Sequence, residues 1–446
     1  MIRTVRYVIR YGCSVIGALL LLIQGLCAQP WEHVRTVQLG SVPANATVAL
    51  AMDGDILAVS VSSDGGGTTR VLTRHQGGLD QWGVIRSIEE ADPWSAYSLA
   101  LRNGMLAVGS PGAASAGPFT GVVRMFRIVP ADLIDPVQTS GSIVLPDAVG
   151  NDRFGYALAW IGDTLLASAV GRSSFHTTGA VFLCADGPQG FQAIGALPIA
   201  SNDVQVPFTR WFGRSIAVAR DRIAIAAPYS GFDVGYAEQN VGAVHLFKPD
   251  LVSGIGWVLD TAWFDAGLDA ADPCRFERIE LGKEGLAFVG DELIMDHSRR
   301  HIGVPGTLLE HWQSHDPAPI GCPECGLRIV QHEASDWDFD GSTSPLASSP
   351  LLQRGVRGWC VDGDTLYVEW FDPTAVTWHT DRHVRDAGGP GAWGVVDEIP
   401  ELDACDDLRG PMIVNGDHLV RTSLRRGSEC GVEDGSMAID LQIFHR

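Results

Sequence analysis

The sequence MDGDILAV, from Met52 to Val59, places a tight turn between two apolar runs. Related phrases follow along the chain, with turns at residues 54, 104, 162, 220, 290, 363 and 416, so that neighbouring turns lie 50 to 73 residues apart. Gly and Asn tolerate the positive φ that a two-residue hairpin requires. The phrases therefore predict seven hairpins, and a repeat of this length is typical of a propeller or another repeat array.

Two further strands are predicted in the repeats. A third apolar run follows several hairpins, as in VVRMF from Val122 to Phe126. A fourth run begins with tryptophan, as in Trp82-Gly83-Val84-Ile85. Four strands in each of seven units predict an all-β fold, a seven-bladed β-propeller with four-stranded antiparallel blades, because radial repetition leaves few strand edges open.

The sequence predicts one extra strand ahead of the first hairpin. The segment 31–39 begins with Trp31, like the outer strands of other repeats, whereas the last repeat has only three recognisable strands before Arg446. We therefore expect this segment to complete the last blade and to close the ring.

Two motifs recur beside the hairpins. The first is the Phe-Gly pair of Arg153-Phe154-Gly155 and Trp211-Phe212-Gly213, and the second is the Gly-Ala-Pro type of Val108-Gly109-Ser110-Pro111 and Ile225-Ala226-Ala227-Pro228. Together they resemble the FG-GAP repeats of integrin-α-type propellers and of related bacterial secreted proteins. The resemblance implies a propeller scaffold that binds partners outside the cell.

The first 28 residues have the pattern of a secretory signal peptide. Arg3, Arg6 and Arg10 precede an apolar run over 15–23, and Ala28 is a small residue at the expected cleavage site. The alternative, a membrane anchor, needs about 20 apolar residues. We expect removal of 1–28, a single domain over 29–446 without a transmembrane segment, and a secreted, periplasmic or cell-surface protein.

The chain is strongly acidic, with 53 Asp and Glu against 32 Lys and Arg and a formal net charge of -21. Such a charge disfavours nucleic acid and anionic membrane surfaces as partners. We expect a monomer whose partner is an unknown protein or glycan.

One segment has the pattern of a metal loop. Asp336, Asp338 and Asp340 alternate along the chain before Gly341, and Ser342 and Ser344 follow. Alternating oxygen donors around a glycine turn can surround Ca²⁺, and the segment resembles the calcium loops of integrin-type propellers. The alternative is an acidic surface turn, because Ala347 stands where an EF-hand has its bidentate Glu.

Seven cysteines follow the leader, and in an exported protein disulfides are the first interpretation. Cys322 and Cys325 are expected to form a local disulfide, with half of a zinc site or a redox pair as the alternatives. Cys405 and Cys430 are expected to form a second pair.

The sequence holds no motif of a hydrolase nucleophile, a zinc protease or a phosphate loop. A sequence cluster of histidines at His297, His301, His311 and His315 matches no standard ligand spacing. The sequence therefore favours a non-catalytic secreted propeller that binds a protein or glycan partner through its blade loops. The alternative is an extracellular hydrolase or lyase with its site in the central mouth.

Overall fold

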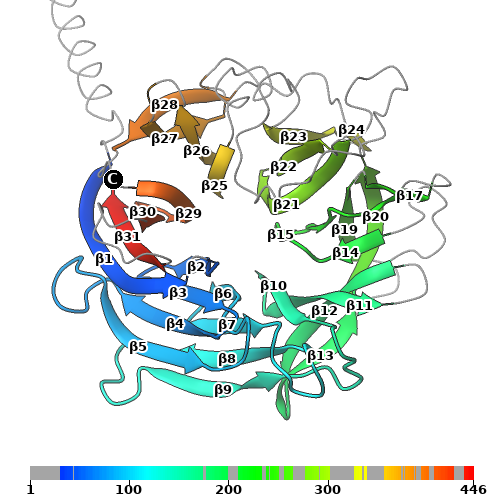
Figure 1. The fold of residues 1–446 in the computed structure, drawn as a ribbon, viewed down its shortest axis with the longest axis horizontal. Helices are drawn as coiled ribbons and strands as arrows, with labels where there is room; N and C mark the ends of the chain where they lie inside the picture. Colours follow the sequence, from blue (N-terminus) through cyan, green and yellow to red (C-terminus); the bar gives the residue numbers. More distant parts are fainter. Residues whose placement is uncertain are drawn as a thin grey trace, which may run out of the picture.

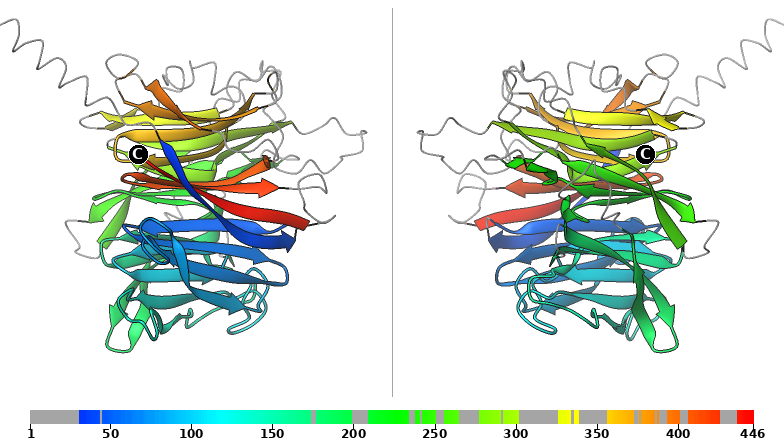
Figure 2. Two further views of the ribbon diagram at one scale, coloured as in Figure 1. Left: turned by 90° about the vertical axis from the view of Figure 1, so that its left-hand side faces the viewer. Right: turned by 90° about the vertical axis from the view of Figure 1, so that its right-hand side faces the viewer.

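A computed structural model shows the protein as a ring of β-sheets around a central axis (Figure 1). It describes residues 31–43, 45–173, 177–198, 209–233, 238–240, 242–250, 256–264, 277–290, 292–301, 326–333, 336–338, 356–372, 375, 377–385, 387, 393–400, 406–425 and 436–446. Seen from the side, the ring is a thick disc (Figure 2). The expected signal peptide lies outside the described residues.

In each large sheet four antiparallel strands are ordered outward from the axis, and the hairpin phrase joins the two innermost strands (Figure 1). The first sheet contains β2 (Thr47–Asp53), β3 (Ile56–Ser63), β4 (Gly66–Thr73) and β5 (Gly83–Glu90), and the second β6 (Ser98–Arg102), β7 (Met105–Ser110), β8 (Val122–Ile128) and β9 (Val137–Ile143). The third contains β10 (Phe154–Ile161), β11 (Thr164–Ser173), β12 (Thr177–Gly187) and β13 (Gly190–Ala196), with β14 (Thr209–Phe212) beside β12. The fourth contains β15 (Ile216–Val218), β16 (Ile223–Ala227), β19 (Ala243–Asp250) and β20 (Gly256–Phe264).

The remaining sheets follow in chain order. The fifth contains β21 (Glu277–Val289), β22 (Glu292–His301), β23 (Gly326–Glu333) and β24 (Asp336–Asp338), and the sixth β25 (Val356–Asp362), β26 (Thr365–Asp372), β27 (Thr377–Val384) and β28 (Gly394–Ile399). The last contains β29 (Asp406–Asn415), β30 (His418–Arg425), β31 (Ser436–His445) and β1 (Glu32–Pro43). A small ribbon, β17 (Gly231–Asp233) with β18 (Glu238–Asn240), forms a separate sheet.

The predicted hairpins are confirmed. Each of the seven phrases joins the first two strands of a large sheet, from β2–β3 to β29–β30. Six of the seven turns contain a residue with the positive φ expected of such hairpins, for example 56° at Gly54, 50° at Asn103 and 57° at Gly363. The β15–β16 turn, from Ala219 to Arg222, is a four-residue loop without one.

The expectation of seven uniform four-stranded antiparallel blades is wrong. Among the residues that the structure describes, six sheets have four antiparallel strands, whereas the sheet of β10 to β13 has five, because β14 adds to β12 in the parallel direction. The pairing of Thr177 with Thr209 and of Gly179 with Phe212 shows the reason. The Phe-Gly segment that leads into β15 lies directly against the preceding sheet, so its backbone bonds there before it enters its own.

Closure of the ring by the N-terminal strand also needs correction. Strand β1 pairs antiparallel with β31, from Glu32 opposite His445 to Pro43 opposite Ser436, and the two lie side by side in Figures 1 and 2. In the described part of the chain β1 forms no strand pair with the first sheet. The seam between the last and first sheets is instead an apolar core, in which Leu57 packs with Val420 and Leu441. Propeller sheets meet face to face, so side-chain packing joins them.

The junctions between neighbouring sheets explain the Phe-Gly motif. A Cβ placed on Gly121 would lie 2.1 Å from the carbonyl oxygen of Phe154, and one on Gly179 would lie 2.2 Å from that of Phe212. Phe154 and Phe212 are fully buried. Glycine is therefore required on one side of each junction for close backbone approach, and a large apolar side chain on the other fills the core.

No helix long and apolar enough to cross a membrane is found among the described residues.

Candidate functional site

Three equivalent residues, Trp94, Arg153 and Trp211, come from the segments that lead into β6, β10 and β15, and Trp211 belongs to β14. In two of the three segments the residue directly precedes the Phe-Gly pair. Their φ values are 51°, 55° and 59°, a conformation that is rare for bulky side chains and that often occurs at functional sites. The repeat therefore fixes the same unusual backbone in three neighbouring segments and brings their side chains together.

The Arg153 guanidinium lies between two indole rings. Its central carbon is 5.2 Å from the ring centroid of Trp94 and 5.7 Å from that of Trp211. Within the described residues the Arg153 side chain makes no hydrogen bond and no ion pair. A guanidinium is always charged and carries five N–H donors in one plane, so Arg153 can donate to an acceptor while it stays over the two indole rings.

A second row of equivalent residues lies beside the first. The hydroxyls of Tyr97 and Tyr156 are 2.9 Å apart, and their ring centroids 4.8 Å. The Arg214 guanidinium carbon is 5.0 Å from the centroid of the Tyr156 ring. Cations over aromatic faces are attracted by the ring quadrupole, so the second row repeats the physical arrangement of the first.

Two more aromatic rings complete the cluster at its ends. Phe119 lies 5.7 Å from Trp94, and Tyr229 lies 5.3 Å from Trp211, both as centroid distances. The backbone N–H of Arg153 donates to the Phe119 carbonyl over 2.9 Å, which fixes the two loops to each other. We call this cluster the Arg–Trp face; its members are Trp94, Tyr97, Phe119, Arg153, Tyr156, Trp211, Arg214 and Tyr229. All of them except the buried Tyr156 are partly exposed.

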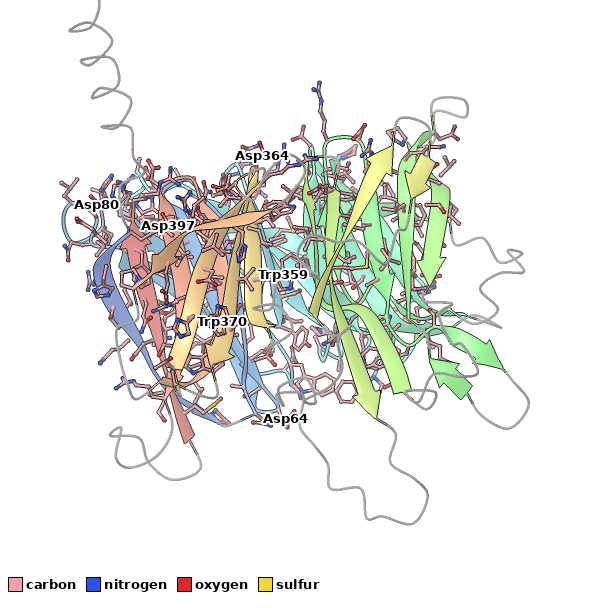
Figure 3. All side chains as sticks on the ribbon, turned by 90° about the horizontal axis from the view of Figure 1, so that it is seen from above. Asp64, Asp80, Trp359, Asp364, Trp370 and Asp397 are labelled. Carbon is pink, nitrogen blue, oxygen red and sulfur yellow. The ribbon has the colours of Figure 1, made fainter. Side chains whose placement is uncertain are left out.

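Asp64 anchors one end of the Arg–Trp face. Its carboxylate accepts the indole N–H of Trp94 over 2.6 Å and the side-chain amide of Asn45 over 3.0 Å. Asp64 lies on the opposite side of the disc, along the ring axis, from Asp364 and Asp397 (Figure 3). The Arg–Trp face is therefore on the side of the disc that carries the β3–β4 turn, and the β25–β26 turn lies on the other side.

The arrangement suits recognition of an anionic group flanked by apolar surface. A carboxylate can accept two parallel N–H bonds from a guanidinium edge, and such charge-assisted pairs are the strong ones. Trp, Tyr and Arg are also the residues that carry most of the free energy at protein interfaces. The sequence analysis did not predict this cluster. The signal that could have indicated it is the large side chain directly before each Phe-Gly pair, Arg153 in one repeat and Trp211 in the next.

The predicted calcium segment is only partly described. Asp336 and Asp338 form β24, opposite Glu333 and Gln331 of β23, whereas Asp340, Ser342 and Ser344 lie outside the described residues. Among the described side chains no group of three His, Cys, Asp or Glu is placed to hold a metal ion. The calcium site stays a prediction.

The cysteines of both predicted disulfides, Cys322 with Cys325 and Cys405 with Cys430, lie outside the described residues. Two described cysteines, Cys184 and Cys360, are free thiols. Burial raises the pKa of Cys184 to about 12 and raises that of Cys360 further. A buried thiol with a raised pKa is a poor nucleophile, so these two side chains serve packing.

The four histidines that lie close in sequence, which matched no ligand spacing, are only partly described. His297 and His301 lie in β22, while His311 and His315 are outside the described residues. The structure shows a different acid-base group. His379 Nε2 is 3.0 Å from Thr377 Oγ1, and its Nδ1 is 2.6 Å from Glu398 Oε1. This group lies on β27 and β28, in the outer half of its sheet and away from the axis (Figure 1), so it does not fit an enzyme site in the central mouth.

No protein-family model and no curated protein sequence matches the chain. Several solved propellers are similar in outline. A structure described as the Dos1 propeller is 7% identical with a TM-score of 0.43, covering 93% of this chain and 95% of that one. The Pan2 WD40 domain of Neurospora crassa is 11% identical with a TM-score of 0.45, covering 93% and 97%. The propeller domain of the Trilobed protease from Pyrococcus furiosus is 10% identical with a TM-score of 0.41, covering 87% and 92%. The sheet topology described above identifies the chain as a β-propeller.

Proposed function

We propose that this chain is a secreted, non-catalytic β-propeller that binds a protein partner through the Arg–Trp face. The observation that carries the proposal is the Arg153 guanidinium, which lies over the rings of Trp94 and Trp211 and has no hydrogen-bond or ion-pair partner in the described part of the chain. The resemblance of the Phe-Gly and Gly-Ala-Pro motifs to FG-GAP repeats supports an extracellular binding role.

The side-chain chemistry favours a protein with an acidic anchor. The Arg153 edge fits an Asp or Glu side chain, and the half-buried rings of Trp94 and Phe119 can cover apolar atoms around that anchor. The rest of the chain is acidic, with a net charge of -21. A basic partner surface would be attracted to the whole domain, and a local acidic residue would then fix its position on the Arg–Trp face.

Site-specific crosslinking tests the proposal. A photoreactive p-benzoylphenylalanine replaces Phe119 on the Arg–Trp face or, as a control, Ile194 on the outer strand β13, where the side chain is 61% exposed. Each protein is irradiated with the secreted proteins of its own source. We expect one major protein adduct from position 119 and none from position 194.

Substitutions separate specific docking from adventitious contact. Arg153→Met in the Phe119-labelled protein should reduce the adduct about tenfold or more, because one charge-assisted bond is worth about 1.5–3 kcal/mol. Arg127→Met is the matched control, since Arg127 is an exposed arginine of β8 that makes no described ion pair, and it should leave the adduct unchanged. Equal adducts from positions 119 and 194, or a protease-resistant glycan adduct, would contradict a protein partner at this face.

A further inference from the structure

A cavity of about 480 Å³ opens at the seam between the first and last sheets. It lies between β1 and the sheet of β3, β4 and β5, and we call it the seam cavity. Leu39 and Val61 supply apolar lining and belong to the core that joins the two sheets. Cavities of roughly 300–1,000 Å³ hold small molecules in proteins, so the seam cavity has the size of a ligand site.

Two opposite charges line the seam cavity without pairing. Arg70 on β4 and Glu89 on β5 are both among its lining residues. The register places Thr68 opposite Glu89 and Arg70 two residues further along β4, so the two side chains lie on the same face as diagonal neighbours. Neither forms an ion pair or hydrogen bond within the described residues.

The third charged lining residue, Glu90, makes its contacts through one carboxylate oxygen, Oε2, and its buried Oε1 has no described partner. Glu90 points to the other face of its sheet, where its carboxylate binds Arg124 and accepts the Ser110 hydroxyl over 2.6 Å. On the face of the sheet that carries Arg70, the polar side-chain groups of the lining are one guanidinium, one carboxylate and the Thr68 hydroxyl, and Ser41 adds a hydroxyl from β1.

We propose that the seam cavity binds a zwitterionic amino acid with an apolar side chain. The ligand carboxylate would accept from Arg70 and its ammonium would donate to Glu89, so both unpaired charges gain a partner. The ligand side chain would cover the apolar lining at Leu39 and Val61. A simple anion would face Glu89, and a simple cation would face Arg70, so neither complements the cavity as well as a zwitterion does.

Calorimetric titration with L-phenylalanine tests this proposal, and two analogues test its charge requirement. The analogue 3-phenylpropionate lacks the ammonium, and 2-phenylethylamine lacks the carboxylate. We expect saturable heat with millimolar L-phenylalanine and binding of each analogue weaker by about tenfold or more.

Variants locate the binding to the seam cavity. Arg70→Met and Glu89→Gln should each weaken phenylalanine binding about tenfold, and Glu89 is exposed at the rim, so Glu89→Gln should leave the fold intact. Arg86→Met is the control, because Arg86 is an exposed arginine of β5 outside the cavity lining. Absence of heat with L-phenylalanine, equal binding of 3-phenylpropionate, or equal binding by Arg70→Met and the wild type would overturn the proposal.

Discussion

Gly121→Ala tests the junction that positions the Arg–Trp face. Gly121 has φ of +83° and bridges to Phe154, the residue after Arg153. An added Cβ would lie 2.1 Å from the Phe154 carbonyl oxygen and 2.4 Å from its nitrogen. Carbon and oxygen atoms normally stay about 3.3 Å apart, so the two backbones must separate by roughly 1.2 Å.

The expected cost has two parts. A positive φ costs an Ala about 1–2 kcal/mol relative to Gly, and overpacking at a tight junction costs about 1–3 kcal/mol more. Gly190→Ala isolates the first part, because Gly190 has φ of +92° and nothing within 4 Å of the added Cβ. We expect a loss of about 2–5 kcal/mol in the free energy of unfolding for Gly121→Ala and about 1–2 kcal/mol for Gly190→Ala.

Equilibrium urea unfolding, followed by tryptophan fluorescence and circular dichroism, measures both losses. The crosslinking assay provides a second readout, since separation at Phe154 would also move Arg153 away from Trp94. Gly121→Ala should therefore lose the partner adduct under conditions where it remains folded, and Gly190→Ala should keep it. Equal destabilisation by the two substitutions would refute the close-approach explanation of the Phe-Gly motif.

Three further predictions concern other parts of the ring. Burial lowers the pKa of His245 to about 4, so between pH 6.5 and 4 the unfolded chain binds a proton that the folded chain does not. The free energy of unfolding should therefore fall by up to about 3 kcal/mol as the pH is lowered over that range. Urea unfolding at several pH values should show a smaller fall for His245→Phe. Trp393→Phe removes the indole donor that lies 3.0 Å from the buried Glu292 carboxylate. In urea unfolding it should lower the free energy of unfolding by about 1–3 kcal/mol more than Trp160→Phe does, because the indole N–H of Trp160 has no described partner. Millimolar Ca²⁺ should raise the melting temperature of the wild type and not that of Asp338→Ala, and calorimetry without heat would contradict the calcium prediction.

Much of the strand order could be read from the sequence. The Gly-Asp phrases, the third apolar runs and the tryptophan-led outer runs correspond to strands such as β3, β8 and β5. These features are local, because a hairpin depends on the φ of two turn residues and on alternating side chains in the flanking strands. The fifth strand of the third sheet was not predicted, since β14 pairs with a neighbouring sheet only when the Phe-Gly backbone meets Gly179.

The sequence by itself determined the repeat, the hairpins and the β class of this protein, because local turn chemistry and apolar periodicity encode them. Only the tertiary structure decided which side chains meet. Trp94, Arg153 and Trp211 come from three different repeats, and the seam cavity forms between the N-terminal strand and the first sheet. Such contacts depend on the angle and spacing between packed sheets, which no single segment of the chain specifies.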